Sequence, residues 1–312
     1  MRVVFAGTPE PAVPSLRALA ASDHEVVAVV TRRDAPLGRK RVLTPSPVAA
    51  AAAELGIPVI KADRLDADAT AAIAAHDPDL GVIVAYGGLV REPLLSMPAH
   101  GWINLHFSLL PRWRGAAPVQ HALIAGDRAT GAAVFQLVPA LDAGDVFAQL
   151  QWEVPENATA ADVLAALALS GASLVGDVVD AIGAGTAASV PQAGEPTLAP
   201  KLSIADGALD FSQSAVRVLD RYRGTTPEPG AHASIGGQRL KVLAAGLGPA
   251  GHDDLPPGTV ALRDKRVLVG TSGGAVELIT VQPAGKAGMA AADWWRGLRA
   301  DEPRFDLPEG AR

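Results

Sequence analysis

The first 140 residues alternate short apolar runs with alanine-rich stretches of helical character. This alternation is typical of a parallel sheet covered by helices on both faces, because helical crossovers connect parallel strands. Strands are predicted at Val3–Ala6, Glu25–Thr31, Leu80–Ala85, Trp102–Leu105 and Ala133–Val138, where β-branched and other apolar residues concentrate.

Helices are predicted at Ala12–Ala21 and Val48–Leu55 and, longest of all, at Thr159–Ile182, where glycines follow the last apolar residues. The segment Arg32–Arg41 is too polar for a helix or a strand, and Pro and Gly interrupt it. It is therefore expected to be an exposed basic loop.

The pattern changes after the long helix. Residues Ala187–Pro200 contain three prolines and no clear periodicity, which is typical of an interdomain linker. Beyond it, short alternating runs separated by Gly-rich turns predict a small, mostly β domain, with a closed barrel as the favoured shape. These runs are Gln238–Ala244, Gly258–Leu262, Arg266–Gly270 and Ala275–Val281. We expect one domain at 1–189, a linker at 190–206 and a second domain at 207–312.

Composition supports two soluble domains. A chain of 312 residues is too long for a single hydrophobic core. Its contents of 49% hydrophobic and 19% charged residues are ordinary for a globular protein. No uninterrupted apolar stretch approaches the roughly 20 residues that cross a bilayer, so a cytoplasmic protein is expected. The absence of cysteine excludes disulfides, thiolate nucleophiles and cysteine-ligated zinc.

The net charge of -6 is distributed unevenly. Residues 1–200 carry 13 basic and 20 acidic side chains, a net of -7, whereas residues 201–312 carry 14 and 13, a net of +1. A nucleic-acid partner would therefore have to be bound by local basic patches.

The densest group of chemically capable residues lies at 101–115. Asn104 and His106 alternate on a predicted strand, so both side chains point to one face near its carboxyl end, where ligands bind in open α/β sheets. Asp142 follows the next predicted strand at the same edge. An amide, an imidazole and a carboxylate suit acyl transfer: Asn104 and a protonated His106 would stabilise the oxyanion, and Asp142 would hold the imidazolium and help to move protons.

Structural explanations remain open for each of these residues. A single histidine at a strand end is often only hydrogen-bonded, and the segment Asp142–Asp145 can be a simple turn. The other histidines show no metal-binding spacing, and Gly7-Thr8-Pro9 extends to neither a dinucleotide fingerprint nor a phosphate-binding loop. No metal site is expected.

Two motifs resemble the signature of the folate-dependent formyltransferases: Asn104-Leu105-His106 followed by Ser108-Leu109-Leu110-Pro111, and Leu141-Asp142-Ala143-Gly144-Asp145. The resemblance implies a Rossmann-like parallel sheet domain with catalytic Asn104, His106 and Asp142. It implies 10-formyltetrahydrofolate as the formyl donor, bound by Ser108, Leu109, Leu110 and Pro111. Phe107 departs from the family pattern, in which a small residue separates the histidine from the folate turn.

Other segments resemble the branch of this family that acts on methionyl-tRNA. They are Phe5–Pro9, the basic loop followed by Thr44–Val48, and Lys201–Ser203 with Gln282–Lys286 in the second domain. This resemblance implies an OB-like β-barrel that contacts tRNA, with initiator methionyl-tRNA as acceptor and formylmethionyl-tRNA for translation initiation as product. Arg39, Lys40 and Arg41 would neutralise tRNA phosphates. A monomer is expected.

Three other functions stay open at this point. The chain could hydrolyse the same folate and release formate, or it could formylate the amine of a sugar nucleotide. It could also be a non-catalytic RNA-binding or folate-binding relative. The basic loop and the second domain favour a tRNA-sized acceptor, and the complete Asn104, His106 and Asp142 set favours catalysis.

Overall fold

The computed structural model describes every residue except 39, 253, 299–301 and 308–312. The chain divides into two compact units. The first unit consists of Met1–Pro118, Ala129–Glu153 and Leu164–Pro200; the second consists of Val119–Arg128, Val154–Val163 and Lys201–Arg312. The second unit thus includes α4 (Pro118–Ala125) from its second residue onward, although α4 lies early in the chain.

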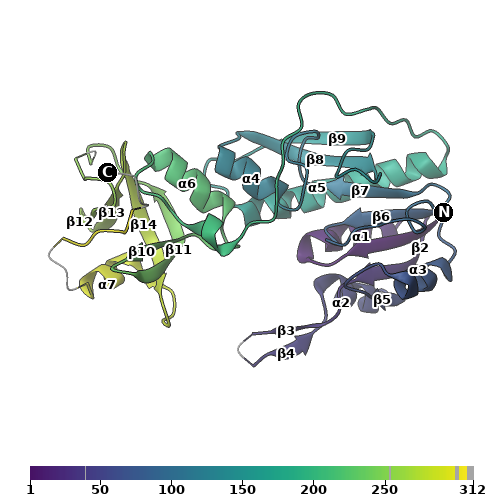
Figure 1. Cartoon of the computed structure of the whole chain (residues 1–312), viewed down its shortest axis with the longest axis horizontal. Helices are drawn as coiled ribbons and strands as arrows, with labels where there is room; N and C mark the ends of the chain where they lie inside the picture. The colour runs from purple at the N-terminus through teal and green to yellow at the C-terminus, as the bar shows by residue number, and fades with distance from the viewer. Residues whose placement is uncertain (39, 253, 299–301, 308–312) are drawn as a thin grey trace. The chain divides into compact units, whose positions relative to one another are not determined.

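The first unit is built on a mixed sheet (Figure 1). In the described part of the chain it has seven strands in the order β5-β2-β1-β6-β7-β8-β9. The strands are β1 (Arg2–Gly7), β2 (Glu25–Thr31), β5 (Val59–Lys61), β6 (Leu80–Val84), β7 (Trp102–His106), β8 (Ala129–Gln136) and β9 (Val146–Glu153). Pairing is parallel from β5 to β7, but β8 runs antiparallel to both β7 and β9. The predicted Rossmann-like parallel sheet is confirmed, and β8 and β9 extend it with antiparallel pairing, which an apolar run does not encode.

Helices cover both faces of this sheet, and the pairing register of the strands shows on which face each side chain lies. The helices are α1 (Val13–Ala20), which follows a 3-10 turn at Glu10–Ala12, α2 (Pro47–Glu54), α3 (Ala67–Ala74) and α5 (Ala160–Gly183). Ile73 of α3 packs in one cluster with Val4 and Ala6. Since Ala6 pairs with Ile83 and Ile83 with Asn104, Asn104 lies on this face of the sheet. Leu105 points to the opposite face, against Gly171 of α5.

The basic segment forms a hairpin rather than the loop expected from its polarity. Strands β3 (Ala35–Leu37) and β4 (Val42–Thr44) pair antiparallel and project from the rest of their unit (Figure 1). Gly38 and Arg41 adopt positive φ angles of 70° and 49° in the turn, and the Arg41 amide donates to the Gly38 carbonyl at 3.1 Å. A short hairpin with exposed faces needs no apolar alternation, so its sequence resembles a loop.

Helix α5 is long and apolar enough to span a membrane by length and composition alone, and 44% of its most apolar window is buried. Val163, Leu167, Val175 and Val179 recur at helical spacing and are buried, so the helix presents an apolar face to the interior. Asp162, Asp177 and Asp180 interrupt its apolar run. The helix therefore packs one face against the protein core.

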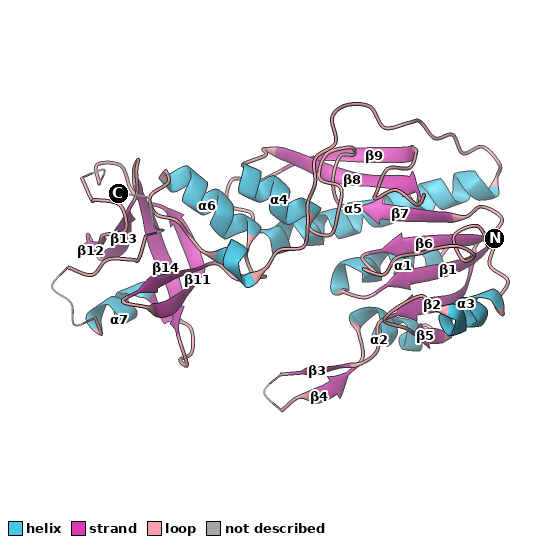
Figure 2. Cartoon of the chain, viewed as in Figure 1, coloured by secondary structure: helices cyan, strands magenta, loops and turns pink. Residues whose placement is uncertain are grey.

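The second unit is mostly β (Figure 2). Its sheet has the order β10-β11-β14-β13-β12, with β15 paired to β14. The strands are β10 (His232–Ile235), β11 (Gln238–Leu247), β12 (Val260–Arg263), β13 (Arg266–Gly270), β14 (Ala275–Pro283) and β15 (Met289–Ala290). The helices α6 (Ala215–Gly224) and α7 (Ala291–Arg296) contribute Val218, Tyr222 and Trp294 to the core, and a 3-10 turn lies at Ile204–Gly207.

The segment Pro303–Asp306 connects the two edges of this sheet. The Val260 amide donates to the Pro303 carbonyl beside β12, and the Asp306 amide donates to the Ser234 carbonyl of β10. Between them, Phe305 forms a bridge with Ile235. The closing element of the barrel is thus a late, irregular segment, which alternation of apolar and polar residues does not reveal.

Candidate active site

Strand β7 carries Asn104 and His106 to the carboxyl edge of the first unit's sheet. Cross-strand pairing places Phe135 opposite Asn104 and Ala133 opposite His106 on β8. The Phe135 ring meets the imidazole edge-on, with a centroid distance of 6.3 Å. Asn104 and His106 therefore share an apolar wall. The Oδ1 atom of Asn104 is buried and has no hydrogen-bond partner within the described residues, so the carboxamide is available to a ligand.

The loop after β7 orients the imidazole. Nε2 of His106 lies 2.8 Å from the Trp113 carbonyl oxygen. Because a carbonyl only accepts, Nε2 carries a proton, and in the neutral ring the free lone pair is on Nδ1. Trp113 presents this carbonyl from a left-handed backbone conformation with φ of 62°.

Asp142 lies beside the other ring nitrogen. Its Oδ2 atom is 3.8 Å from His106 Nδ1 and accepts the Gly115 amide at 2.7 Å. The hydrogen bond from the Gly115 amide fixes the carboxylate in place. The backbone of Asp142 is left-handed, with φ of 44°. Asp142 therefore lies beside His106 as expected, but not because their strands end at one edge. β8 runs antiparallel to β7 and ends at the opposite edge, and the loop that follows β8 carries Asp142 back to the imidazole.

Burial lowers the pKa of His106 below its ordinary value, and the Asp142 carboxylate and the Trp113 carbonyl offset only part of that effect. The imidazole is 5% exposed, so the charged form loses most of its hydration. The lowered pKa favours the neutral ring at pH 7, a protonation state that the sequence alone did not specify. A neutral His106 takes up a proton first and can donate to an oxyanion only afterwards.

Gly144 leaves no room for a side chain in the loop that carries Asp142. A Cβ atom at this position would overlap the carbonyl oxygen of Gln136, which is backbone and cannot rotate away. Gly144→Ala is expected to destabilise the protein by about 1–3 kcal/mol through forced overpacking. Urea denaturation measures this change. Ala143→Gly, next to it, is the control; equal stability of Gly144→Ala and the parent protein would contradict the prediction.

Comparison with known proteins identifies the family. The family model described as formyl transferase matches residues 1–179, and the one described as formyl transferase, C-terminal domain, matches residues 201–299. A methionyl-tRNA formyltransferase from Clavibacter sepedonicus is 64% identical over 96% of this chain and 97% of its own length. The chain belongs to the methionyl-tRNA formyltransferase family. A second relative with that name, from Leifsonia xyli subsp. xyli, is 62% identical over 95% of this chain and 97% of its own.

Solved structures share the fold of this methionyl-tRNA formyltransferase family member. WlaRD, a sugar 3N-formyl transferase solved with dTDP and 5-N-formyl-THF, superposes with a TM-score of 0.67 at 14% identity, over 92% of this chain and 99% of its own. A methionyl-tRNA formyltransferase from Clostridium thermocellum superposes with a TM-score of 0.56 at 14% identity, over 80% and 94%. HypX from Aquifex aeolicus, solved with tetrahydrofolic acid, gives 0.63 at 18% identity, over 98% and 51%.

The turn expected to contact folate lies directly after β7. Ser108, Leu110 and Pro111 are buried and Leu109 is half-buried. The Ser108 hydroxyl donates to the Arg112 carbonyl at 2.6 Å, so this side chain shapes the turn from within. Phe107, the departure from the family pattern, is 6% exposed, and its ring therefore lies inside the protein.

Two of the three cations expected to contact tRNA lie on the β3–β4 turn. Lys40 and Arg41 are exposed there, and Arg39 lies outside the described residues. The same hairpin exposes Leu37, Val42 and Leu43 by 59–68%, an unusual set of apolar side chains for a solvated surface. The hairpin thus combines positive charge with apolar contact area.

Sequence reasoning missed two polar residues that contact this site, Gln192 and Thr197. Gln192 donates to the carbonyl oxygens of Asp142 and Gly144, and Thr197 accepts the Trp113 amide. Both lie in the stretch where three prolines and missing periodicity predicted only a linker. No local signal identifies them, because their partners are 48–84 residues away in the chain.

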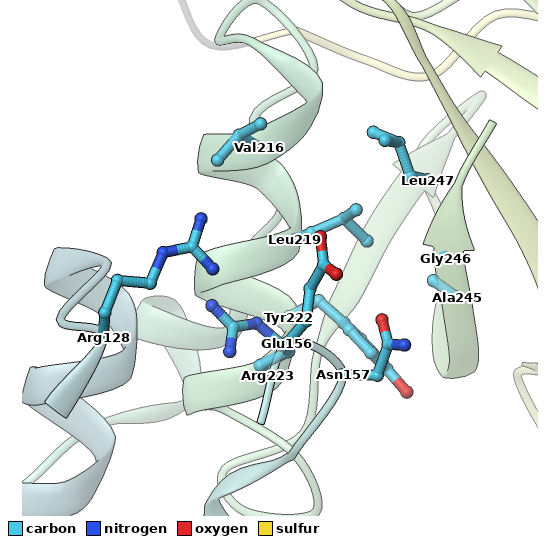
Figure 3. Close-up of a pocket in the computed structure, with 10 residues that line it drawn as sticks. All are labelled: Arg128, Glu156, Asn157, Val216, Leu219, Tyr222, Arg223, Ala245, Gly246 and Leu247. Carbon is cyan, nitrogen blue, oxygen red and sulfur yellow. The ribbon is translucent and has the colours of Figure 1, made fainter. Parts of the chain in front are cut away.

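A separate cavity of about 70 Å³ lies in the second unit and is lined by none of the expected site residues (Figure 3). Val216, Leu219 and Leu247 supply apolar side chains to it, and Arg128 and Arg223 supply guanidinium groups. Arg223 is buried and paired with Asp220 at 2.5 Å, so its charge is already balanced. Asn104 and His106, which are expected to be catalytic, lie instead on β7 of the first unit.

Proposed function

We propose that the protein transfers a formyl group from 10-formyltetrahydrofolate to the α-amino group of methionyl-initiator tRNA and so produces formylmethionyl-tRNA for translation initiation. The convergence of Asn104, His106 and Asp142 in a chain 64% identical to a methionyl-tRNA formyltransferase carries this proposal. We assign formyl transfer to residues 1–189, the connection to 190–206 and acceptor docking to 207–312. In this proposal the enzyme acts as a cytoplasmic monomer.

The proposed reaction begins with the amine of methionine attacking the formyl carbon. The carbonyl oxygen becomes an oxyanion, which the Asn104 carboxamide stabilises as a fixed donor. The nitrogen that attacks must lose a proton, and the lone pair of neutral His106 Nδ1 accepts it. Asp142, 3.8 Å away, then stabilises the imidazolium. That proton passes to the folate nitrogen as it leaves, so no covalent enzyme intermediate is needed.

The formyl donor is proposed to lie against the turn Ser108–Pro111. Ser108, Leu110 and Pro111 are buried, and Leu109 is the residue of this turn that keeps part of its surface exposed. The folate-bound states of WlaRD and HypX, which share the fold, support a reduced folate as the ligand class. The unpartnered Asn104 oxygen is a suitable acceptor for an N–H group of one of the substrates.

The hairpin cations are proposed to bind phosphates of the acceptor arm. For the double variant Lys40→Ala/Arg41→Ala we expect weaker tRNA binding, and a plot of log affinity against log salt that is shallower by about 1.4–1.8, because each phosphate contact contributes about 0.7–0.9. Filter binding at several salt concentrations measures this slope. Arg91→Ala, which removes an exposed arginine outside the hairpin, is the control. An unchanged slope in the double variant would refute phosphate contact by these residues.

The decisive test is incubation of the purified protein with 10-formyltetrahydrofolate and charged initiator tRNA, followed by detection of formylmethionine. Parallel reactions omit the tRNA or replace it with an amino-sugar nucleotide. Rapid formate release without tRNA would favour a hydrolase, and formylation of the sugar amine would favour a sugar-nucleotide transferase. Folate binding without any turnover would favour a non-catalytic relative.

A further inference from the structure

The segment Val190–Ala199, here called the strap, crosses both loops that carry the catalytic groups. At one end, Val190 pairs with Val146, just after the Asp142 loop. At the other end, Ala199 accepts the Ala117 amide and donates to the Arg114 carbonyl at 2.7 Å. The strap therefore holds two loops that are distant in sequence, one beside each nitrogen of the His106 ring.

Gln192 binds the loop of the carboxylate. Its Nε2 atom donates to the carbonyl oxygens of Asp142 and Gly144 at 2.8 and 2.9 Å. Its Oε1 atom accepts hydrogen bonds from Nε and Nη2 of Arg114 at 3.1 and 2.6 Å. One carboxamide thus fixes the left-handed backbone of Asp142 and links it to the loop that contains Trp113.

Thr197 binds the loop on the other side of the imidazole. Its hydroxyl oxygen accepts the Trp113 amide at 2.9 Å, and its carbonyl oxygen accepts the Arg114 amide at 2.9 Å. The Trp113 carbonyl in turn accepts the proton of His106 Nε2. The hydroxyl of Thr197 thereby supports the left-handed conformation that directs this carbonyl at the ring.

We propose that Gln192 and Thr197 are positioning residues, which fix Asp142 and the Trp113 carbonyl and thereby set the tautomer and the basicity of His106. This inference rests on the proposed formyl transfer for its effect on turnover. Its effect on the imidazole does not depend on which substrate is used. Asp142 is the one titratable side chain in the described residues whose charge acts on His106, and Trp113 and Phe135 contribute no charge.

Matched variants separate positioning from general structure. Thr197→Val keeps the shape but removes the hydroxyl acceptor, whereas Thr197→Ser keeps the acceptor. Gln192→Met keeps the length but removes all four hydrogen bonds and tests the other end of the strap independently. Glu195→Gln changes an exposed side chain of the same strap and is the control.

For Thr197→Val and Gln192→Met we expect kcat to fall by about 10- to 100-fold, since a misplacement of about 1 Å costs roughly that much, with little change in KM for tRNA. Both variants remove support that raises the pKa of His106. The acid limb of the kcat/KM profile, where the base becomes protonated, therefore moves to lower pH. Thr197→Ser and Glu195→Gln should retain the parent values and the parent profile.

Nitrogen-15 NMR of the histidines gives a readout that does not require activity, with the His106 signal assigned by its loss in His106→Asn. The unsubstituted protein should show a neutral Nε2–H tautomer, and the two variants should show a mixture and a lower titration midpoint. An unchanged His106 tautomer and midpoint in both variants, or failure of Thr197→Ser to restore them, would overturn the inference. If the unsubstituted protein does not formylate methionyl-tRNA, the proposed function fails while this NMR comparison still decides the inference.

Discussion

His106→Ala is expected to lower kcat/KM for methionyl-tRNA by about 10²- to 10⁴-fold, the usual contribution of a positioned general base. The variant loses the Nδ1 lone pair that receives the proton, while Asn104 and Asp142 remain in place. Initial-rate formylation measurements give the value, and circular dichroism verifies that the fold survives. His100→Ala removes an exposed histidine whose hydrogen bonds within the described part of the chain involve its backbone, and it should behave as the parent.

Substitutions of Asn104 and Asp142 test the same proposed mechanism. Asn104→Ala removes an oxyanion donor and is expected to cost about 10²- to 10³-fold in kcat. Because His106 and Asp142 act on the same proton, the double variant His106→Ala/Asp142→Ala should be little worse than His106→Ala alone. Activity near that of the parent in the His106→Ala variant would remove the basis for the proposed mechanism.

Phe305→Ala is expected to destabilise the second unit by about 3–5 kcal/mol, the range for removal of a buried aromatic side chain. Phe305 is 2% exposed and stacks on Phe211 and Trp294, with centroid distances of 5.0 and 6.1 Å. The ring thus fills the core at the point where the chain closes the barrel. Chemical denaturation followed by tryptophan fluorescence reports on this region directly, because Trp294 belongs to the stack.

Leu262→Ala is the matched control for this variant. Leu262 is 43% exposed on β12, so its truncation should cost about 1 kcal/mol or less. If Phe305→Ala were no more destabilising than Leu262→Ala, then Pro303–Asp306 would not close the barrel in solution.

The regular elements could be predicted because their signal is local. The runs Glu25–Thr31 and Arg266–Gly270 match β2 and β13 residue for residue, since β-branched residues fill each strand and polar or Gly-containing segments bound it. The approach of Asp142 to His106 was predicted, but the reason given for it, a shared edge of the sheet, was wrong. Because β8 runs antiparallel to β7, it ends at the opposite edge, and the loop after β8 brings Asp142 back to His106.

Features that depend on distant partners could not be predicted in the same way. The strap contacts are hydrogen bonds between side chains and backbone groups, 48–84 residues apart, and they leave no periodic trace. The β3–β4 hairpin has no buried face, so it shows no alternation. The neutral state of His106 depends on burial by Phe135 and the surrounding loops, which the strand pattern alone does not specify.

The late closing segment of the second barrel affects the order in which the protein can mature during synthesis. The last strand of the first sheet ends at Glu153, and the strap that completes the catalytic edge ends at Ala199. The second barrel cannot join its edges until Asp306 has left the ribosome. More than a third of the residues follow Ala199, so the candidate active site can form on the nascent chain well before the second barrel can close, and the second unit must wait as an open sheet with two unpaired edges.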